Sequence, residues 1–238
     1  FDGEHFFDGS AANADYAMSA LEPAVHGGAA CLVLCDTNGG TFPDKIDKVT
    51  QEVGKRFPGV QVGIHTHNDR GMAVANSIAA VQAGATHVQG TYLGYGERCG
   101  NANLSTIIPN LQAALGYCCI PRENIHLLTT TARHLAEISN IVLPKGSPYV
   151  GASAFAHKAG MHADGVLKVS HSFEHIDPQA VGNERRFLMS EMSGRTAVLK
   201  KIRAIRPELT RESPETLKIL QSLKEMEQLG YQFEGADS

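Results

Sequence analysis

Three short apolar segments recur at a regular spacing and constrain the fold more than any other feature of the sequence. They begin at residues 30, 60 and 86, so their starts lie about 30 and about 26 residues apart. That spacing is the size of a strand followed by a helix. Apolar residues at helical spacing fill the gaps, over residues 13–26, 43–53, 71–83 and 103–115. The pattern predicts about four consecutive βα units in a parallel sheet with right-handed crossovers.

Four such units are too few to close an eight-stranded barrel. Two folds remain open, a small open sheet or the second half of a (β/α)8 barrel. Polar residues follow every predicted strand, and loops that converge on one centre favour the barrel. We therefore expect an α/β fold in which residues 1–120 form the C-terminal half of a TIM barrel. Residues 121–238 are expected to form a mostly helical linker subdomain, with helices near 123–141, 195–205 and 214–229. Residues 1–8 are interpreted as the end of an earlier strand and its loop.

Composition excludes several classes of function. The net charge of −4 gives no basic surface for nucleic acid. No apolar run approaches the roughly 20 residues that span a bilayer, and no signal peptide opens the chain, so we expect no membrane partner. The five cysteines are an odd number. Adjacent Cys118 and Cys119 are poorly placed to pair with each other, and Cys31 and Cys35 lie in an apolar strand. These features indicate a reduced, cytoplasmic protein.

Two histidines, His65 and His67, mark the end of the second apolar segment. Side chains two residues apart on a strand point to the same face. Two imidazoles with an oxygen donor from the next strand end, such as Asn101, suit a catalytic divalent metal with open positions. The alternative is two ordinary loop histidines that hydrogen-bond to Asp69 or to the backbone. The position at a strand end favours the metal.

Other polar residues at the strand ends are candidates for chemistry. Glu4 and Glu97 could act as a general base or orient a substrate, although a solvated charge or a Glu97–Arg98 ion pair is the simpler alternative. Thr37 could hydrogen-bond a substrate carboxylate, or it could be a turn residue. His162, five residues after another histidine, is by composition alone a helix-surface histidine.

Four motifs carry a resemblance to a known family. At these residues the chain resembles the 2-isopropylmalate, homocitrate and citramalate synthases, metal-dependent barrel enzymes whose wider group includes hydroxymethylglutaryl lyase. The motifs are HTHNDRG at 65–71, GYGERCGNANL at 94–104, FAHKAGMHADG at 155–165 and HIDPQAVG at 175–182. CDTNGG at 35–40 and FDGEHFFDG at 1–9 look most like the citramalate synthase branch.

The resemblance implies a role for each candidate. His65 and His67 would be metal ligands, and Asn101 a further ligand. Thr37 would bind the keto acid, and Glu4 would be the catalytic carboxylate. His162 would be a catalytic histidine that reaches the site of a neighbouring subunit, which implies a homodimer. The implied cofactor is Mg²⁺, Mn²⁺ or Zn²⁺, and acetyl-CoA is the second substrate.

The implied reaction is a Claisen-type condensation of acetyl-CoA with pyruvate, in isoleucine biosynthesis. The metal would polarise the ketone and stabilise the alkoxide that develops. The rival within the family is 2-isopropylmalate synthase, acting on 2-oxoisovalerate in leucine biosynthesis. A lyase that cleaves a 3-hydroxyacyl thioester is disfavoured by the helical region with His162. A non-catalytic half-barrel fragment is the alternative of another class.

Three departures from the family pattern affect these expectations. The arginine–aspartate motif of the first barrel strand is absent, as is a C-terminal regulatory domain. Phe173 stands where the family usually has a tyrosine, and a phenyl ring cannot donate a hydrogen bond. We therefore expect the 238-residue chain alone to be inactive as an acyltransferase, with activity in the complete protein.

Overall fold

The computed structural model describes residues 1–157, 165–166, 168–187, 202–203, 205–210, 212–229 and 231. The chain divides into two compact units. The first comprises Phe1–Arg122 and His134–Ile141, and the second comprises Glu123–Arg133 and Val142–Ser238. The expected boundary at residue 120, between the half barrel and the helical linker subdomain, stays a prediction. Within the described ranges, every helix is too short or too polar to cross a membrane.

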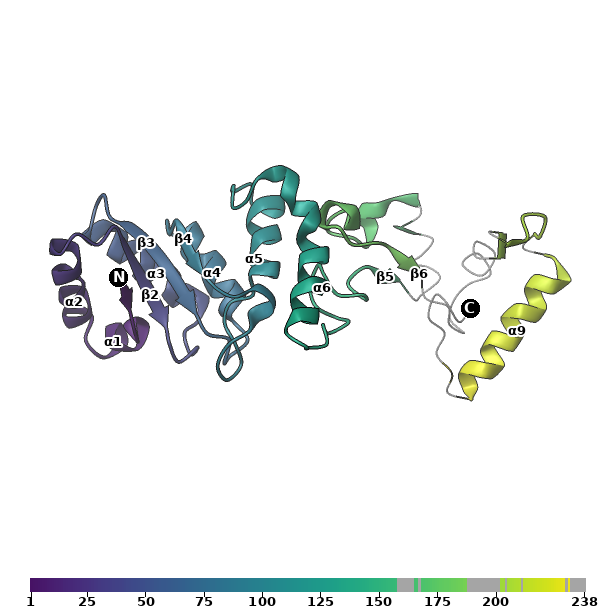
Figure 1. Ribbon diagram of the computed structural model, residues 1–238, viewed down its shortest axis with the longest axis horizontal. Coiled ribbons are helices and arrows are strands. Elements are labelled where there is room, and N and C mark those ends of the chain that lie inside the picture. Colours follow the sequence, from purple (N-terminus) through teal and green to yellow (C-terminus); the bar gives the residue numbers. More distant parts are fainter. Residues whose placement is uncertain are drawn as a thin grey trace. The chain divides into compact units, whose positions relative to one another are not determined.

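A four-stranded parallel sheet forms the centre of the first unit (Figure 1). Its strands pair in chain order, and each pairs in parallel with the next. They are β1 (Asp2–Gly3), β2 (Cys31–Asp36), β3 (Gln61–Thr66) and β4 (His87–Gln89). Parallel strands in sequential order confirm the expected α/β fold.

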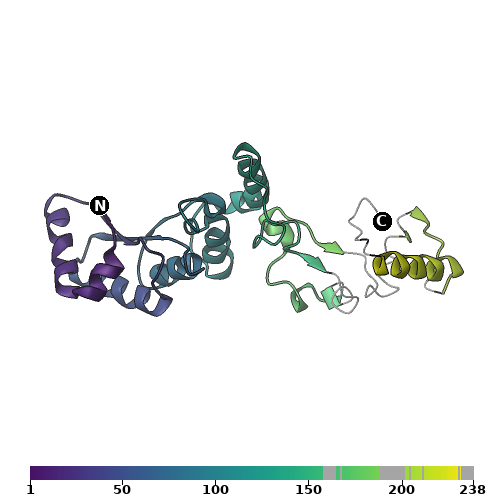
Figure 2. The ribbon, with the colours of Figure 1, turned by 90° about the horizontal axis from the view of Figure 1, so that it is seen from below.

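Four helices connect and follow these strands, and Figure 2 shows them along one side of the sheet. They are α1 (Phe6–Ala12), α2 (Ala14–His26), α3 (Pro43–Arg56) and α4 (Ala73–Gln82). The Asn13 side chain caps α2 by accepting a hydrogen bond from the Tyr16 amide. Pro43 begins α3, where its missing N–H is no loss.

The two faces of the sheet carry different side chains. Leu32, Leu34 and Ile64 point toward the helices and are each fully buried in one core with residues of α1 to α4. Their neighbours Cys35 and His65 point to the opposite face, because side chains alternate along a strand. Right-handed crossovers in sequential order put every helix on the same side, which is the arrangement of a barrel. The expectation of a partial barrel is confirmed.

Several elements differ from those expected. Residues 1–8 were expected to be a strand end and a loop, but helix α1 already begins at Phe6. The strand expected over 86–92 is only three residues long, because the backbone of Ala102 crosses close to Gly90. The helix expected over 103–115 is α5 (Leu104–Pro109), followed by a wide π-type turn over Asn110–Ala114. Proline lacks the N–H that regular helical hydrogen bonding needs.

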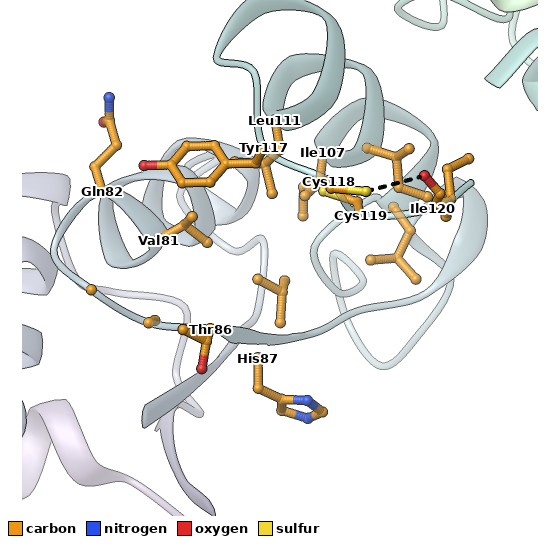
Figure 3. A pocket seen from close by; sticks show the side chains of 15 residues that line it. Val81, Gln82, Thr86, His87, Ile107, Leu111, Tyr117, Cys118, Cys119 and Ile120 are labelled. Atoms are coloured by element: carbon orange, nitrogen blue, oxygen red, sulfur yellow. Dashed lines mark hydrogen bonds between the residues drawn. The ribbon is translucent and has the colours of Figure 1, made fainter. Parts of the chain in front are cut away.

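A cavity of about 740 Å³ lies between α4, α5 and the start of β4 (Figure 3). Its walls are mostly apolar and include Val81, Val88, Ile107, Leu111 and Ile120. Because it opens at the amino end of β4, it lies away from the strand ends that carry His65 and His67. We therefore do not assign it to the candidate site.

Beyond the sheet, the described residues form helices and turns with one small sheet. The elements are η3 (Arg122–Leu127), α6 (Leu128–Ile138), β5 (Ala156–His157), η4 (Ser170–Ser172), η5 (Pro178–Val181), β6 (Arg186–Phe187) and α9 (Pro214–Gln228). The parallel pair β5–β6 was not expected, because two-residue strands are too short to show alternation. The helix expected over 195–205 falls largely outside the described residues.

A buried charge cluster holds the small sheet of the second unit. The Glu174 carboxylate accepts two hydrogen bonds from Arg185, and it lies 3.0 Å from Nε2 of His157. The guanidinium of Arg185, and then His157, lower the pKa of Glu174. His157 is the last residue of β5, so the cluster fixes the chain where the FAHKAGMHADG motif leaves the sheet.

The packing of the sheet predicts that two isoleucine-to-alanine substitutions differ in how much they lower the free energy of unfolding. Replacing fully buried Ile64 with alanine is expected to lower the free energy of unfolding by about 2–5 kcal/mol, because a cavity remains. Ile138 is 67% exposed, and Ile138→Ala is expected to cost within about 0.5 kcal/mol. Urea denaturation measures both. Equal losses would contradict the assignment of the packed face.

Candidate active site at the carboxyl ends of the strands

Three predicted metal ligands lie together at the end of β3. The rings of His65 and His67 are 5.2 Å apart between centroids. The backbones of His67 and Asn101 form an isolated antiparallel bridge, which puts their side chains side by side. Among the described residues, no three His, Cys, Asp or Glu side chains gather as a metal site, and the donor that lies beside the two histidines is the amide of Asn101.

Two polar atoms of this cluster are buried without a hydrogen-bond partner in the described structure, Nδ1 of His67 and Oδ1 of Asn101. The Asn101 amide nitrogen donates to the Tyr95 carbonyl at 2.9 Å, which turns its oxygen away from that carbonyl. An unpaired buried acceptor is costly unless something binds it. Imidazole nitrogen and amide oxygen both bind divalent cations, so the donor set fits a metal ion.

The state of the His67 ring also suits a metal ligand. Burial lowers its pKa, and His65 and Arg98 lower it further. A lowered pKa keeps the imidazole neutral over a wider pH range, and the neutral form is the one that binds metal.

The structure also brings Glu4 and Thr37 together. The Thr37 hydroxyl donates to Oε2 of Glu4 at 2.8 Å and accepts from the His5 amide at 2.8 Å. His5 has a positive φ of 53°, which turns the chain sharply after β1. The carboxylate follows β1 and the hydroxyl follows β2, so both lie at the same edge of the sheet as the histidines.

Cys35 lies on the same face of the sheet, opposite His65 in the pairing of β2 with β3. Burial raises the pKa of its thiol to about 12, and the charges of Glu4 and Asp2 add to the shift. The thiol is therefore protonated at neutral pH. It fills space as a small apolar side chain and is not a nucleophile.

Arg98 and Asp69, which the sequence did not single out as functional, tie three loops together. Arg98 donates Nε to Oδ1 of Asp69 at 2.8 Å and Nη2 to Oδ2 at 3.0 Å. The same Nη2 donates to the Thr37 carbonyl at 2.7 Å. One guanidinium thus links the loops after β2, β3 and β4, which carry Thr37, His67 and Asn101.

Glycine permits this close approach. Gly39 has a φ of +60°, and a Cβ there would lie 2.4 Å from Oδ2 of Asp69. Gly96 has a φ of +153°, and a Cβ there would lie 2.2 Å from Nδ2 of Asn101. Side chains at either position would push the carboxylate or the amide out of place.

The remaining candidates are placed differently. The Glu97 side chain is 84% exposed, 3.7 Å from Nη1 of Arg98, so it lies at the rim and not among the clustered side chains. His162 lies outside the described residues. Asp36 is fully buried and accepts hydrogen bonds from Gly40 and Thr41, so it shapes the loop after β2. Each proposed role of a site residue stays a prediction.

The Arg98–Asp69 pair predicts a pH effect. Hydrogen bonding from Arg98 lowers the pKa of Asp69. The stability that the pair contributes is present above the unfolded-state pKa of Asp69 and is lost as the pH falls through its lowered folded-state pKa. Arg98→Ala is expected to return the Asp69 pKa toward its ordinary value, as measured by NMR titration of the carboxyl carbon. Arg70→Ala, which removes a cation above the Phe42 ring, is the matched control. An unchanged Asp69 pKa in Arg98→Ala would contradict the pairing.

Comparison with known proteins supports the resemblance drawn from the motifs. The profile of the HMGL-like family matches residues 5–142, and that of the homocitrate synthase post-HMGL domain-like family matches residues 149–230. (R)-citramalate synthases from Aquifex aeolicus and Synechocystis sp. are 52% and 51% identical to this chain over its whole length. A probable 2-isopropylmalate synthase from Methanopyrus kandleri is 36% identical over 92% of the chain.

The chain spans only part of these relatives, 45% of the two citramalate synthases and 43% of the probable 2-isopropylmalate synthase. The match to the first family nevertheless covers more than half of the 238 residues. It begins one residue after Glu4, so it includes the ends of β2, β3 and β4 but not that of β1. The chain therefore belongs to the HMGL-like family.

Proposed function

We propose that this chain is part of an acyltransferase that condenses acetyl-CoA with pyruvate to form citramalate. The observation that carries the proposal is the cluster of His65, His67 and Asn101, in which two buried polar atoms lack a hydrogen-bond partner in the described structure. The names of the relatives at 52% and 51% identity support the choice of reaction.

A divalent cation, Mg²⁺, Mn²⁺ or Zn²⁺, would be held by the His65, His67 and Asn101 side chains. When bound, it supplies a Lewis acid for the keto oxygen of the substrate and stabilises negative charge on that oxygen. Arg98 and Asp69 hold the three loops around this position. Their part is to keep the donor atoms in place before the substrate arrives.

Glu4 and Thr37 supply the remaining chemistry of this half of the site. Glu4 is proposed to accept a methyl proton from acetyl-CoA, and Thr37 to bind the carboxylate of the keto acid. The Thr37 hydroxyl has one hydrogen, which it now donates to Glu4. When that hydrogen turns to a substrate carboxylate, Oε2 of Glu4 is left without this hydrogen bond. Binding of the keto acid would thus free a lone pair of Oε2 to accept the methyl proton.

The complete catalytic unit is proposed to be a cytoplasmic homodimer, in which His162 of one subunit reaches the site of the other.

The second candidate reaction uses 2-oxoisovalerate, as in 2-isopropylmalate synthase. The lower identity to the probable 2-isopropylmalate synthase, 36% against 52% and 51%, favours pyruvate. A non-catalytic half-barrel module is the third alternative. It would be favoured if the complete protein showed no turnover with either keto acid.

The substrate is tested by thiol release from acetyl-CoA in the complete protein with Mg²⁺ or Mn²⁺. We expect a higher kcat/KM with pyruvate than with 2-oxoisovalerate. His65→Ala should lower turnover at least about a hundredfold and weaken Mn²⁺ binding, since a first ligand is lost. His26→Ala changes an exposed histidine in the last turn of α2 and is the matched control. Unchanged metal content in His65→Ala would exclude the ligand assignment.

The role of Thr37 predicts a split between two substitutions. Thr37→Val keeps the shape of the side chain but removes the hydroxyl. The KM for pyruvate should rise about tenfold or more, because the free energy of a hydrogen bond to a charged group is lost. Thr37→Ser keeps the hydroxyl and should stay within about threefold. Steady-state kinetics at saturating acetyl-CoA measures both. Equal KM values would show that the hydroxyl does not bind the keto acid.

A further inference from the structure

Three side chains form a hydrogen-bonded chain across the face of the sheet opposite the helices. Nδ1 of His65 lies 3.0 Å from Oε1 of Gln89. Nε2 of Gln89 lies 3.3 Å from both carboxylate oxygens of Asp2. His65 and Gln89 are also direct partners in the pairing of β3 with β4. No motif or spacing in the sequence marks Gln89 or Asp2 as functional.

The contact between Asp2 and Gln89 requires a curved sheet. Neighbouring strands lie about 4.8 Å apart, so β1 and β4 would be about 14 Å apart in a flat sheet. Side chains stand roughly perpendicular to a sheet and would not meet across that distance. The hydrogen bond is therefore possible because this face is concave, and it links the first strand to the fourth.

The charge of Asp2 determines how the Gln89 amide is oriented. A carboxylate can only accept hydrogen bonds, so the amide nitrogen must face it. The amide oxygen then faces His65, and because that oxygen can only accept, Nδ1 of His65 must carry a hydrogen. In a neutral imidazole the other nitrogen, Nε2, is then unprotonated and is the donor atom available to a cation.

We propose that Gln89 is a positioning residue that fixes the tautomer of His65, and that Asp2 fixes Gln89. The proposal rests on the metal site of the proposed function. It adds a second layer to that site, since the partner of a ligating histidine sets both its ring orientation and its basicity. Gln89 and Asp2 act through His65 and need not touch the substrate.

The test follows the His65 ring directly, in the complete protein freed of metal by a chelator. Nitrogen-15 NMR of labelled histidine, at an alkaline pH where imidazole is neutral, reports which ring nitrogen carries the hydrogen. We expect Nδ1–H in the unchanged protein and loss of that preference in Gln89→Leu. Mn²⁺ affinity, measured by calorimetry without substrate, should fall about 10- to 100-fold in Gln89→Leu.

Two further variants keep the test decisive. Gln89→Glu retains an acceptor for Nδ1–H and should keep the tautomer, so a shifted ring in this variant would overturn the proposal. Gln61→Leu removes an exposed glutamine from the start of β3 and should change neither readout. Unchanged tautomer and unchanged Mn²⁺ affinity in Gln89→Leu would also overturn it.

His65→Ala separates this inference from the proposed function. If His65→Ala weakens Mn²⁺ binding but Gln89→Leu does not, the metal site stands and Gln89 has no positioning role. If His65→Ala leaves Mn²⁺ binding unchanged, the metal site itself is wrong.

Discussion

The alternation of side chains along β2 and β3 is the constraint on which the rest of the molecule depends. Leu34 and Ile64 enter the core under the helices, so Cys35 and His65 must face the other way. Parallel strands that follow in chain order with the usual right-handed crossovers put all the helices on one side. The opposite, concave side carries the polar side chains of His65 and Gln89 beside that of Cys35, and the candidate site lies at its carboxyl edge.

Loops assemble this site from separate parts of the chain. Two sets of hydrogen bonds stabilise the site. One is made by the Arg98 guanidinium at the rim, and the other joins Asp2, Gln89 and His65 on the concave face. Both use side chains that are polar yet bonded on several sides, which limits their freedom. The site is therefore positioned by hydrogen bonds between loops as much as by the sheet beneath it.

The sequence predicts the strands and helices, which depend on the periodicity of apolar residues, but it does not predict contacts that depend on how the strands pair. Strands β2 and β3 and the helix beginning at Pro43 follow from local patterns, and the order of the strands indicated that Asn101 lies near His67. The role of Gln89 does not, because strand register brings it opposite His65 and no local pattern reveals register. The Glu97–Arg98 ion pair that the sequence suggested is present at 3.7 Å, but the bidentate partner of Arg98 is Asp69, 29 residues away.

The short distance between Gly39 and Asp69 has a consequence for motion. The space that a side chain would take at Gly39 is filled by the carboxylate, and backbone hydrogen bonds join the same two loops. Neither loop has room to slide past the other. If the rim opens to admit a ligand, the loops after β2 and β3 are therefore expected to move together as one body.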